Sequence, residues 1–178
     1  GALGTYKSLT NIKCVELEPS IAKASVFFAH VNRAILMNPR FQLIFSDARH
    51  YLMTSLDNHY DLITSEPSNP WMAGIATLYT QEAFELVHKK LKGDGIFCQW
   101  FHSYSMSEKD FKMIINTFAS VFPHVMLLTT GDKDFFLMGS KQAWRMDYQK
   151  IQNLFLENVE LNKDMLSLGW PHPFTLIA

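Results

Sequence analysis

The sequence predicts an α/β fold in which a mostly parallel sheet is covered by helices on both faces. The first observation behind this prediction is that short apolar runs, typical of strands, alternate with longer segments of helical apolar spacing. The second is a pair of apolar runs within residues 125–139, joined by a polar turn, which predicts a closing antiparallel hairpin. The third is size: 178 residues, 48% of them hydrophobic and 19% charged, suffice for a globular domain with its own core.

The strands are predicted from apolar runs that are bounded by turn residues or by charged residues. The first four runs are each followed by a segment with helical character, so we expect them to lie parallel in the sheet. The last two are separated by Thr-Gly-Asp-Lys at residues 130–133, so we expect them to pair as a hairpin. The predicted strands are 12–17, 41–45, 60–65, 96–100, 125–129 and 134–139.

The helices are predicted from apolar residues that recur every three or four positions and from end signals. The segment 80–91 has this spacing, and Gly93 and Gly95 follow it, as glycines often do at helix ends. Ser107 with Asp110 three residues later resembles a capping box and marks the start of another helix. The predicted helices are 1–9, 19–34, 49–55, 80–91, 107–122, 147–156 and 159–168.

Composition argues against several classes of function. A formal net charge of −1 gives no electrostatic case for binding nucleic acid. No apolar run approaches the length of a membrane span, and the seven histidines show no metal-binding spacing, so we predict no metal site. Cys14 and Cys98 each lie inside an apolar strand-like run, which predicts buried free thiols rather than a disulfide.

The segment YDLITSEPSNPWMAG, residues 60–74, is the strongest candidate for a site. Its apolar strand leads directly into Glu66, and Pro67 and Pro70 cannot continue a central strand because each lacks an amide donor. The chain should therefore leave the sheet at Glu66 and present Ser68, Asn69 and Trp71 on a stiff loop. Ligands of open α/β sheets bind beyond the carboxyl ends of the strands. The alternative is a rigid connector whose carboxylate caps the following helix.

Acidic residues also follow the first two predicted strands. Glu16 and Glu18 end the first strand, and Asp47 with Ala48 follows the second. A carboxylate at such a position can accept two hydrogen bonds from the ribose hydroxyls of a nucleotide, and one on the next strand can accept from adenine. The alternative for each carboxylate is that it caps the next helix. With Glu66 as a third acidic strand end, ligand binding is the better interpretation.

Three longer motifs resemble one known family. The runs VELEPS, NPRFQLIFSDARHYL and YDLITSEPSNPWMAGIATLYTQEAFELVHKKLKGDGIFCQW are similar to the spermidine/spermine synthase family of polyamine aminopropyltransferases. The motif EPSNPWMAG resembles most the spermidine-synthase-like branch that is often fused to membrane-spanning segments. The resemblance covers about residues 12–140. It implies the class I S-adenosylmethionine-dependent methyltransferase-like Rossmann fold and transfer of an aminopropyl group to an amine such as putrescine.

The resemblance also implies the ligands. The co-substrate would be decarboxylated S-adenosylmethionine or S-adenosylmethionine, with methylthioadenosine as the product of aminopropyl transfer, and no tightly bound cofactor or metal. Glu16 with Leu17 would bind the ribose, and Asp47 with Ala48 the adenine. The resemblance further implies a cytoplasmic location, which could be that of the cytoplasmic domain of a membrane protein.

The resemblance places the reaction in the loop after the third strand. Glu66 stands where the family has its catalytic aspartate, in a D-S-S-D-P motif, and Pro67 stands where the family has serine. Asn69 replaces the second aspartate of that motif, which removes a negative charge. The resemblance implies that Glu66 and Tyr79 are catalytic, that Glu66 and Pro67 also contact the nucleoside, and that the substrate is bound by Ser68, Asn69, Trp71 and Tyr79.

Two other functions stay open from the residues. SNPW loosely resembles the Asn-Pro-Pro-aromatic loop of amino-methylating enzymes, which would fit a small-molecule methyltransferase. A catalytically inactive nucleoside-binding domain of a larger membrane protein would fit Asn69, because a sensor needs no paired acid. The feature that separates them is a second anion at the amine site. Asp132 and Asp134 are the candidates if the hairpin folds toward the cleft.

The resemblance also predicts how the chain is organised. Residues 1–140 would form the nucleoside-binding domain, and residues 141–178 the start of a helical C-terminal extension that continues further in the family. Residues 1–9 align with the family's first helix, so its Gly-rich loop and first strand would lie upstream. We expect a small-molecule amine as substrate and no nucleic acid partner. A homodimer is compatible with the resemblance, and so is a covalent link to membrane-spanning segments outside the chain.

Overall fold

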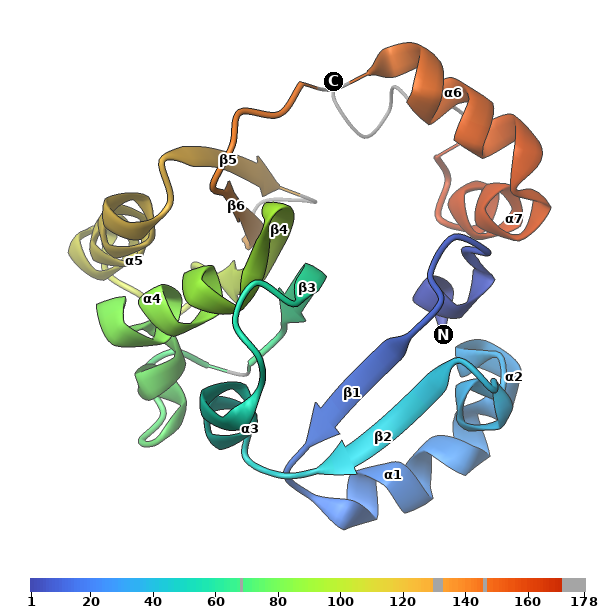
Figure 1. The fold of residues 1–178 in the computed structure, drawn as a ribbon, viewed down its shortest axis with the longest axis horizontal. Helices are drawn as coiled ribbons and strands as arrows, with labels where there is room; N and C mark the ends of the chain where they lie inside the picture. Colours follow the sequence, from blue (N-terminus) through green and yellow to red (C-terminus); the bar gives the residue numbers. More distant parts are fainter. Residues whose placement is uncertain (68, 130–132, 146, 171–178) are drawn as a thin grey trace. The chain divides into compact units, whose positions relative to one another are not determined.

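The computed structural model describes residues 1–67, 69–129, 133–145 and 147–170, and its ribbon is drawn in Figure 1. The chain divides into two compact units. The first contains residues 1–48 together with the chain from Arg145 onward, and the second contains Arg49–Trp144. Each unit has its own hydrogen-bonded sheet, and each is described here by itself.

The first unit is built on a parallel pair of strands. Strand β1 (Ile12–Glu16) pairs with β2 (Phe41–Phe45) in a register that sets Ile12 beside Phe41 and Glu16 beside Phe45. Arg33 forms salt bridges with Glu160, at 2.8 Å, and with Asp164. These two ion pairs connect the C-terminal part of the chain to the rest of this unit. Its helices are η1 (Ala2–Thr5), α1 (Pro19–Ser25), η2 (Val26–Phe28), α2 (Ala29–Asn32), η3 (Ile35–Met37), α6 (Tyr148–Glu157) and α7 (Val159–Ser167).

The predicted N-terminal helix 1–9 is reduced to one short turn, η1. The guanidinium of Arg40 explains the difference, because it donates hydrogen bonds to the carbonyl oxygens of Gly4, Tyr6 and Leu9 at 2.6 to 2.8 Å. Those carbonyls point toward the start of β2 instead of along a helix axis. A continuous helix over these residues was therefore a wrong prediction.

The predicted helix 19–34 is broken into three pieces, α1, η2 and α2. The side-chain amide of Asn32 donates to the carbonyl oxygen of Ser25 at 2.7 Å, which replaces a helical backbone bond. Arg33 and Ala34 then adopt left-handed backbone angles, with φ of 60° and 48°, and so end the segment. The start at Pro19 agrees with the prediction, because Glu18 caps it through the backbone amide of Ser20.

The second unit has a four-stranded mixed sheet in the order β3-β4-β6-β5. Strands β3 and β4 are parallel, whereas β6 runs antiparallel to both of its neighbours and forms the predicted hairpin with β5. Of the predicted turn, residues 130–132 lie outside the described part of the chain. The elements are α3 (Ala48–Thr54), β3 (Tyr60–Ser65), η4 (Ile75–Tyr79), α4 (Gln81–Lys90), β4 (Leu91–His102), α5 (Glu108–Val121), β5 (His124–Thr129) and β6 (Asp134–Ser140).

Helices α4 and α5 cover one face of this sheet with an aromatic core (Figure 1). Phe84 on α4 and Phe118 on α5 are fully buried against Phe97 of β4. Alternation along β4 follows from the strand geometry, since Phe97, Gln99 and Phe101 face these helices while Cys98 and Trp100 face the opposite side. Ser107 caps α5 by accepting from the amide of Asp110 at 3.2 Å, as predicted.

Gly93 and Gly95 do not end helix α4, which corrects the prediction. The helix ends at Lys90 and β4 begins at Leu91, so both glycines lie in the strand. The register of β3 and β4 shifts there, from Tyr60 beside Leu91 to Leu62 beside Ile96. A Cβ on Gly95 would lie 2.8 Å from the carbonyl oxygen of Tyr60, so glycine lets the two strands approach at this irregularity.

The cysteines are free thiols, as expected, but only one of them is shielded. Cys98 is partly buried in β4, and burial raises the pKa of its thiol. Cys14 is exposed in β1, whose sheet has only two strands. The prediction of a buried thiol was therefore wrong for Cys14.

Candidate functional site

Glu66 lies directly after β3, on the loop that the sequence singled out, and its side chain is exposed. The structure argues against the helix-cap alternative for this carboxylate. The next helix, η4, has Gly74 as its N-cap, and the cap of α4 is the hydroxyl of Thr80, which accepts from the amide of Ala83 at 3.3 Å. Glu66 is therefore not a capping residue of either helix.

The strand register places Glu66 on the face of the sheet opposite α4 and α5. Thr64 lies beside Cys98, and side chains two residues further along each strand point to the same side. The carboxylate of Glu66 adds to burial in raising the pKa of the Cys98 thiol, which agrees with this placement. Trp100 and His102, further along β4, occupy the same face.

Four rings gather around the end of β4, and we call Trp71, Trp100, His102 and Tyr104 the ring cluster. The imidazole of His102 stacks on Tyr104 with ring centroids 3.4 Å apart and meets the edge of Trp71 at 4.9 Å and the ring of Trp100 at 5.3 Å. Trp71 and Tyr104 are 47% and 41% exposed, whereas His102 is fully buried. The cluster thus presents two accessible aromatic faces beside the loop that carries Glu66.

Asn69 fastens that loop to the sheet. Its side-chain oxygen Oδ1 lies 2.7 Å from Nε2 of His102, and its amide nitrogen lies 3.8 Å from the sulfur of Met72. Nδ1 of His102 has no hydrogen-bond partner among the described residues. Burial lowers the pKa of His102, while the charge of Asp134 and the backbone of Tyr104 act to raise it.

His102 was missed by reasoning from the sequence, which ended the strand at Trp100. The signal was present, because Gln99 and His102 interrupt the apolar run IFCQWFH and polar residues inside such runs are seldom buried without a partner. Gln99 is also fully buried, and its amide nitrogen donates to the carbonyl oxygen of Trp100 at 2.9 Å. Its Oε1 has no partner among the residues that the structure describes.

Tyr79 lies in the core rather than on the loop surface. It is 7% exposed, its hydroxyl donates to the carbonyl oxygen of Trp100 at 3.3 Å, and burial raises its pKa well above the usual value. Of the remaining residues predicted for this loop, Pro67 is half-buried and Ser68 lies outside the described residues. A catalytic role for Tyr79 stays a prediction, and the geometry fits a residue that anchors the end of β4.

The residues predicted to bind the ribose and the adenine lie in the first unit, at the carboxyl ends of β1 and β2. Glu16 is half-buried and accepts a hydrogen bond from the backbone amide of Glu18 at 2.9 Å, while Leu17 beside it is exposed. Glu18, not Glu16, caps α1. Asp47 and Ala48 are exposed at the start of α3.

Glu16 and Asp47 belong to the same edge of the two-stranded sheet. The register sets Glu16 beside Phe45, and Asp47 follows two residues later. The positions expected to bind the ribose and the adenine are therefore grouped in the first unit, whereas Glu66 and Pro67, also expected to contact the nucleoside, lie with the ring cluster in the second.

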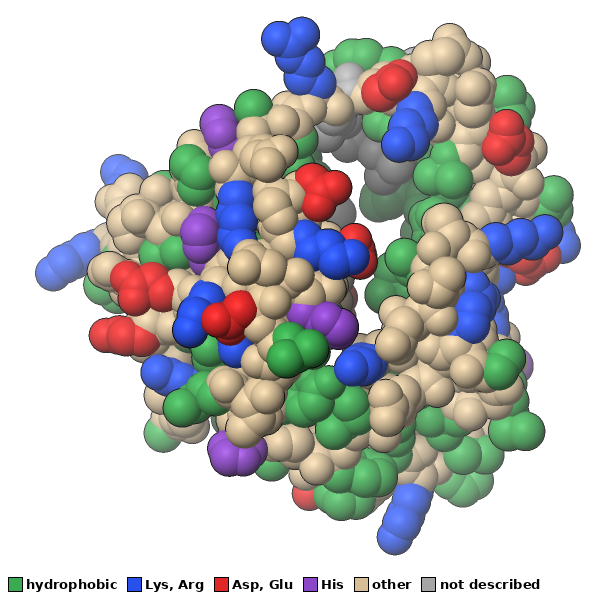
Figure 2. Space-filling model, viewed as in Figure 1, with side chains coloured by type: hydrophobic (Ala, Val, Ile, Leu, Met, Phe, Trp, Pro, Cys, Tyr) green, Lys and Arg blue, Asp and Glu red, His purple; other side chains and the backbone are tan. Residues whose placement is uncertain are grey.

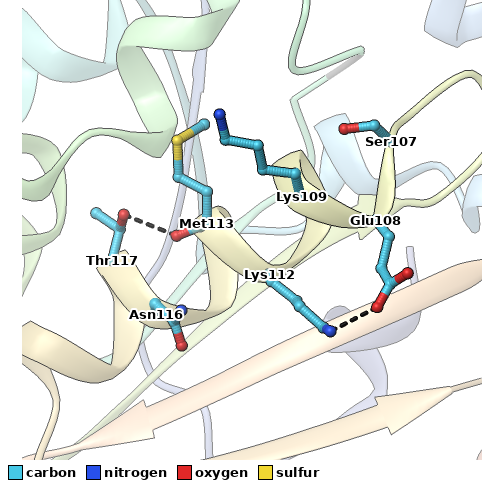
Figure 3. A pocket seen from close by; sticks show the side chains of 7 residues that line it. All are labelled: Ser107, Glu108, Lys109, Lys112, Met113, Asn116 and Thr117. Carbon is cyan, nitrogen blue, oxygen red and sulfur yellow. Dashed lines mark hydrogen bonds and ion pairs between the residues drawn. The ribbon is translucent and has the colours of Figure 1, made fainter.

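Two other surface features supply no competing site. A shallow hollow on α5 is lined by residues of that helix and its N-cap alone, so no second element brings a group into it (Figure 3). Its charged residues include an exposed Glu108–Lys112 ion pair at 2.5 Å. On the face drawn in Figure 2, acidic and basic side chains are interspersed. No set of three potential metal ligands converges among the described residues, and none of their helices is long and apolar enough to span a membrane.

Comparison with known proteins adds independent evidence. A family model described as the spermine/spermidine synthase domain matches residues 2–131. A polyamine aminopropyltransferase of Aeropyrum pernix is 25% identical over 122 residues, which cover 67% of this chain and 39% of the relative. A putrescine N-methyltransferase of Nicotiana attenuata is 26% identical over 117 residues, covering 66% of this chain and 31% of the relative. The chain thus spans about two fifths or less of the length of these relatives.

Solved structures with similar folds show the same relationship. A spermidine synthase in complex with the transition state analogue AdoDATO has a TM-score of 0.69 at 17% identity, with 93% of this chain and 63% of that chain covered. Human methyltransferase-like protein 13 in complex with SAH has a TM-score of 0.62 at 16% identity, with 88% and 71% covered. The chain therefore has the class I methyltransferase-like Rossmann fold. Because the family model matches well over half of its residues, the protein belongs to the spermine/spermidine synthase family.

Proposed function

We propose that the protein is a spermidine-synthase-like transferase that moves the aminopropyl group of decarboxylated S-adenosylmethionine to an amine such as putrescine. The observation that carries this proposal is an exposed carboxylate, Glu66, on a loop fixed beside the ring cluster at the end of the parallel pair β3–β4. Carboxyl ends of parallel strands are where this class of fold binds its ligands. Family membership supports the same chemistry.

The nucleoside would be held by the first unit. The carboxylate of Glu16 would accept hydrogen bonds from both ribose hydroxyls, and Asp47 with Ala48 would contact the adenine. A carboxylate suits a vicinal diol because it accepts two charge-assisted bonds at once. Leu17 would supply an apolar contact to the nucleoside. A relative whose bound ligand is named AdoDATO supports a ligand of this chemical class.

The acceptor amine would be held by the loop of the second unit. An ammonium group is attracted both by the charge of Glu66 and by the faces of exposed aromatic rings, and Trp71 and Tyr104 provide such faces. Ser68, Asn69 and Tyr79 would complete the substrate contacts. The sulfonium of the co-substrate is already an activated leaving group, so the protein has mainly to align the amine and remove its proton.

A methyltransferase is the second candidate, and one observation favours it. The relatives include a putrescine N-methyltransferase at 26% identity, which is comparable to the 25% and 26% of two polyamine aminopropyltransferases. Both reactions displace a thioether from a sulfonium with an amine, so the same loop would serve either. An inactive nucleoside-binding domain is the third possibility, since Asn69 lacks the charge of the acid in the family motif. A homodimer, a membrane link and a cytoplasmic location stay predictions.

The product of the reaction distinguishes these candidates. The protein would be incubated with putrescine and either decarboxylated S-adenosylmethionine or S-adenosylmethionine, and the nucleoside product identified by mass spectrometry. Methylthioadenosine with an aminopropylated amine supports the proposal, and S-adenosylhomocysteine supports the methyltransferase. Nucleoside binding with no product from either donor would support the inactive domain and contradict the proposal.

The role of Glu66 is tested in the same assay. Glu66→Gln keeps the size of the side chain and removes its charge, so turnover should fall by about 100-fold or more, while nucleoside affinity by calorimetry stays unchanged. Glu108→Gln, which alters another exposed glutamate at the start of α5, is the matched control and should retain full activity. Retained turnover in Glu66→Gln would remove this carboxylate from the reaction.

A further inference from the structure

The unpartnered nitrogen of His102 is the most unusual polar group in the second unit. The whole side chain is buried, yet Nδ1 forms no hydrogen bond with any described residue. Leaving a buried polar atom unsatisfied is unfavourable and uncommon, so such an atom calls for a reason. It lies at the carboxyl end of β4, on the same face as Glu66 and next to the loop that we propose binds the acceptor amine.

The contact with Asn69 determines which nitrogen of the imidazole carries the proton. Asn69 presents its oxygen to Nε2 at 2.7 Å, and its amide nitrogen is directed to Met72. An amide oxygen can only accept, so Nε2 carries hydrogen and the lone pair of the neutral ring resides on Nδ1. Burial lowers the pKa of His102, so the ring is neutral at physiological pH. Nδ1 is therefore available as a proton acceptor.

Two groups beside His102 partly offset the effect of burial on the cation that would form when Nδ1 takes up a proton. Asp134 lies directly beside it in the antiparallel register of β4 and β6, and both the Asp134 charge and the Tyr104 backbone act to raise the pKa of His102. Among the described residues, titratable groups on neighbouring elements also include Glu66 on the loop, the Tyr104 phenol, and Lys133, whose carbonyl oxygen accepts from the amide of Ser103 at 2.9 Å. The ring is thus neutral before the reaction, and Asp134 and the backbone of Tyr104 would stabilise its charged form.

We propose that Nδ1 of His102 accepts the proton that the acceptor amine loses during transfer, with Asn69 as the positioning residue that fixes the competent tautomer. This proposal rests on the transferase function proposed above. The bound ammonium gives one proton to Nδ1, and the lone pair freed on its nitrogen forms a bond to the carbon next to the sulfonium, while the carbon–sulfur bond breaks with its electron pair going to sulfur. The products are an imidazolium, a neutral thioether and the alkylated ammonium.

This chain has Asn69 where the family motif has an aspartate, and the proposed role of His102 gives a physical reason for the difference. A carboxylate at position 69 would pair with a protonated His102 and hold it charged, whereas an amide leaves the ring neutral. Glu66 then serves as the charge that attracts the ammonium, and His102 as the base. The rings of Trp71 and Tyr104, which both contact the imidazole of His102, are substantially exposed.

The proposal is tested by the pH dependence of kcat/KM for putrescine with whichever of the two donors is used. In the wild type, activity should rise with pH through the pKa of His102, which lies below its ordinary value of 6.5. This rise is the acidic limb of the pH profile. Asn69→Asp should move the acidic limb to higher pH by about one unit or more, because a carboxylate beside Nε2 favours the charged ring. Asp134→Asn should move it to lower pH. His102→Gln should abolish the limb and lower kcat by about 100-fold.

A matched control is available in His88, whose pKa is also lowered by burial and whose ring contacts Phe122 on the other face of the sheet. His88→Gln should leave the acidic limb in place. Titration of labelled histidine by NMR in the wild type and in Asn69→Asp gives the pKa of His102 without turnover, and it should match the kinetic limb. A limb that survives in His102→Gln, or that differs from the NMR value, would overturn the role of His102 alone. Absence of turnover with both donors would overturn the proposed function, and this proposal with it.

Discussion

Replacing Gly139 with alanine tests how closely strand β6 packs against helix α5. A Cβ at this position would lie 2.6 Å from Cε1 of Phe118 and 2.6 Å from Cγ of Phe122. Carbon atoms pack at about 3.5–4.0 Å, so both rings would have to retreat by about 1 Å. Neither is free to do so, because each is fully buried and stacks on Phe97, with centroids 5.7 and 5.8 Å apart.

The expected loss of stability follows from this overlap. Overpacking of a core lowers the free energy of unfolding by about 1–3 kcal/mol. Because the new Cβ clashes with two confined rings, we expect a loss of about 3 kcal/mol for Gly139→Ala. Urea unfolding followed by circular dichroism measures it. With a slope of about 2 kcal/mol per molar urea, the midpoint should fall by about 1.5 M.

The control for Gly139→Ala is Gly93→Ala in β4. Its Cβ would meet only the side-chain nitrogen of Gln142, at 3.2 Å, at the far end of a flexible side chain. We expect a change within about 0.5 kcal/mol. The double variant Gly139→Ala with Phe118→Leu removes one of the two obstructing rings, so it should recover part of the stability lost in Gly139→Ala. A midpoint for Gly139→Ala that equals the wild type would refute the close packing of β6 on α5.

Three further predictions concern the nucleoside, a helix cap and pH. Asp47→Ala should abolish nucleoside binding in calorimetry, and unchanged affinity would remove Asp47 from the site. Ser107→Ala should lower the free energy of unfolding by about 1 kcal/mol, because the amide of Asp110 loses its cap acceptor; equal urea midpoints would contradict this. Burial and Lys141 lower the pKa of His88, so folding favours its neutral form and stability should fall as pH drops below about 6.5. His88→Gln should weaken that fall in urea titrations, and an unchanged pH dependence would exclude His88 as a contributor.

The extent to which the site was predictable differs between its residues. Glu66 was identified because an acid between an apolar strand and two prolines is a local pattern, and the structure places it at that strand end. His102 was not identified, because its importance depends on Asn69 and Asp134, which lie on two other segments of the chain. Tyr79 was assigned to the site by resemblance, and only packing reveals that its hydroxyl is engaged by the backbone of Trp100.

The spacing of apolar residues in the sequence was enough to locate most of the strands and helices. The strands Phe41–Phe45 and Tyr60–Ser65 coincide with the prediction, since the pattern that makes a strand is contained in the strand. The tertiary structure decided the exceptions. Arg40 draws the carbonyls of the N-terminal segment away from a helix, and a bulge beside Gly95 extends β4 back to Leu91. These outcomes depend on contacts between distant residues, which local patterns do not encode, and so does the neutral, half-satisfied imidazole of His102.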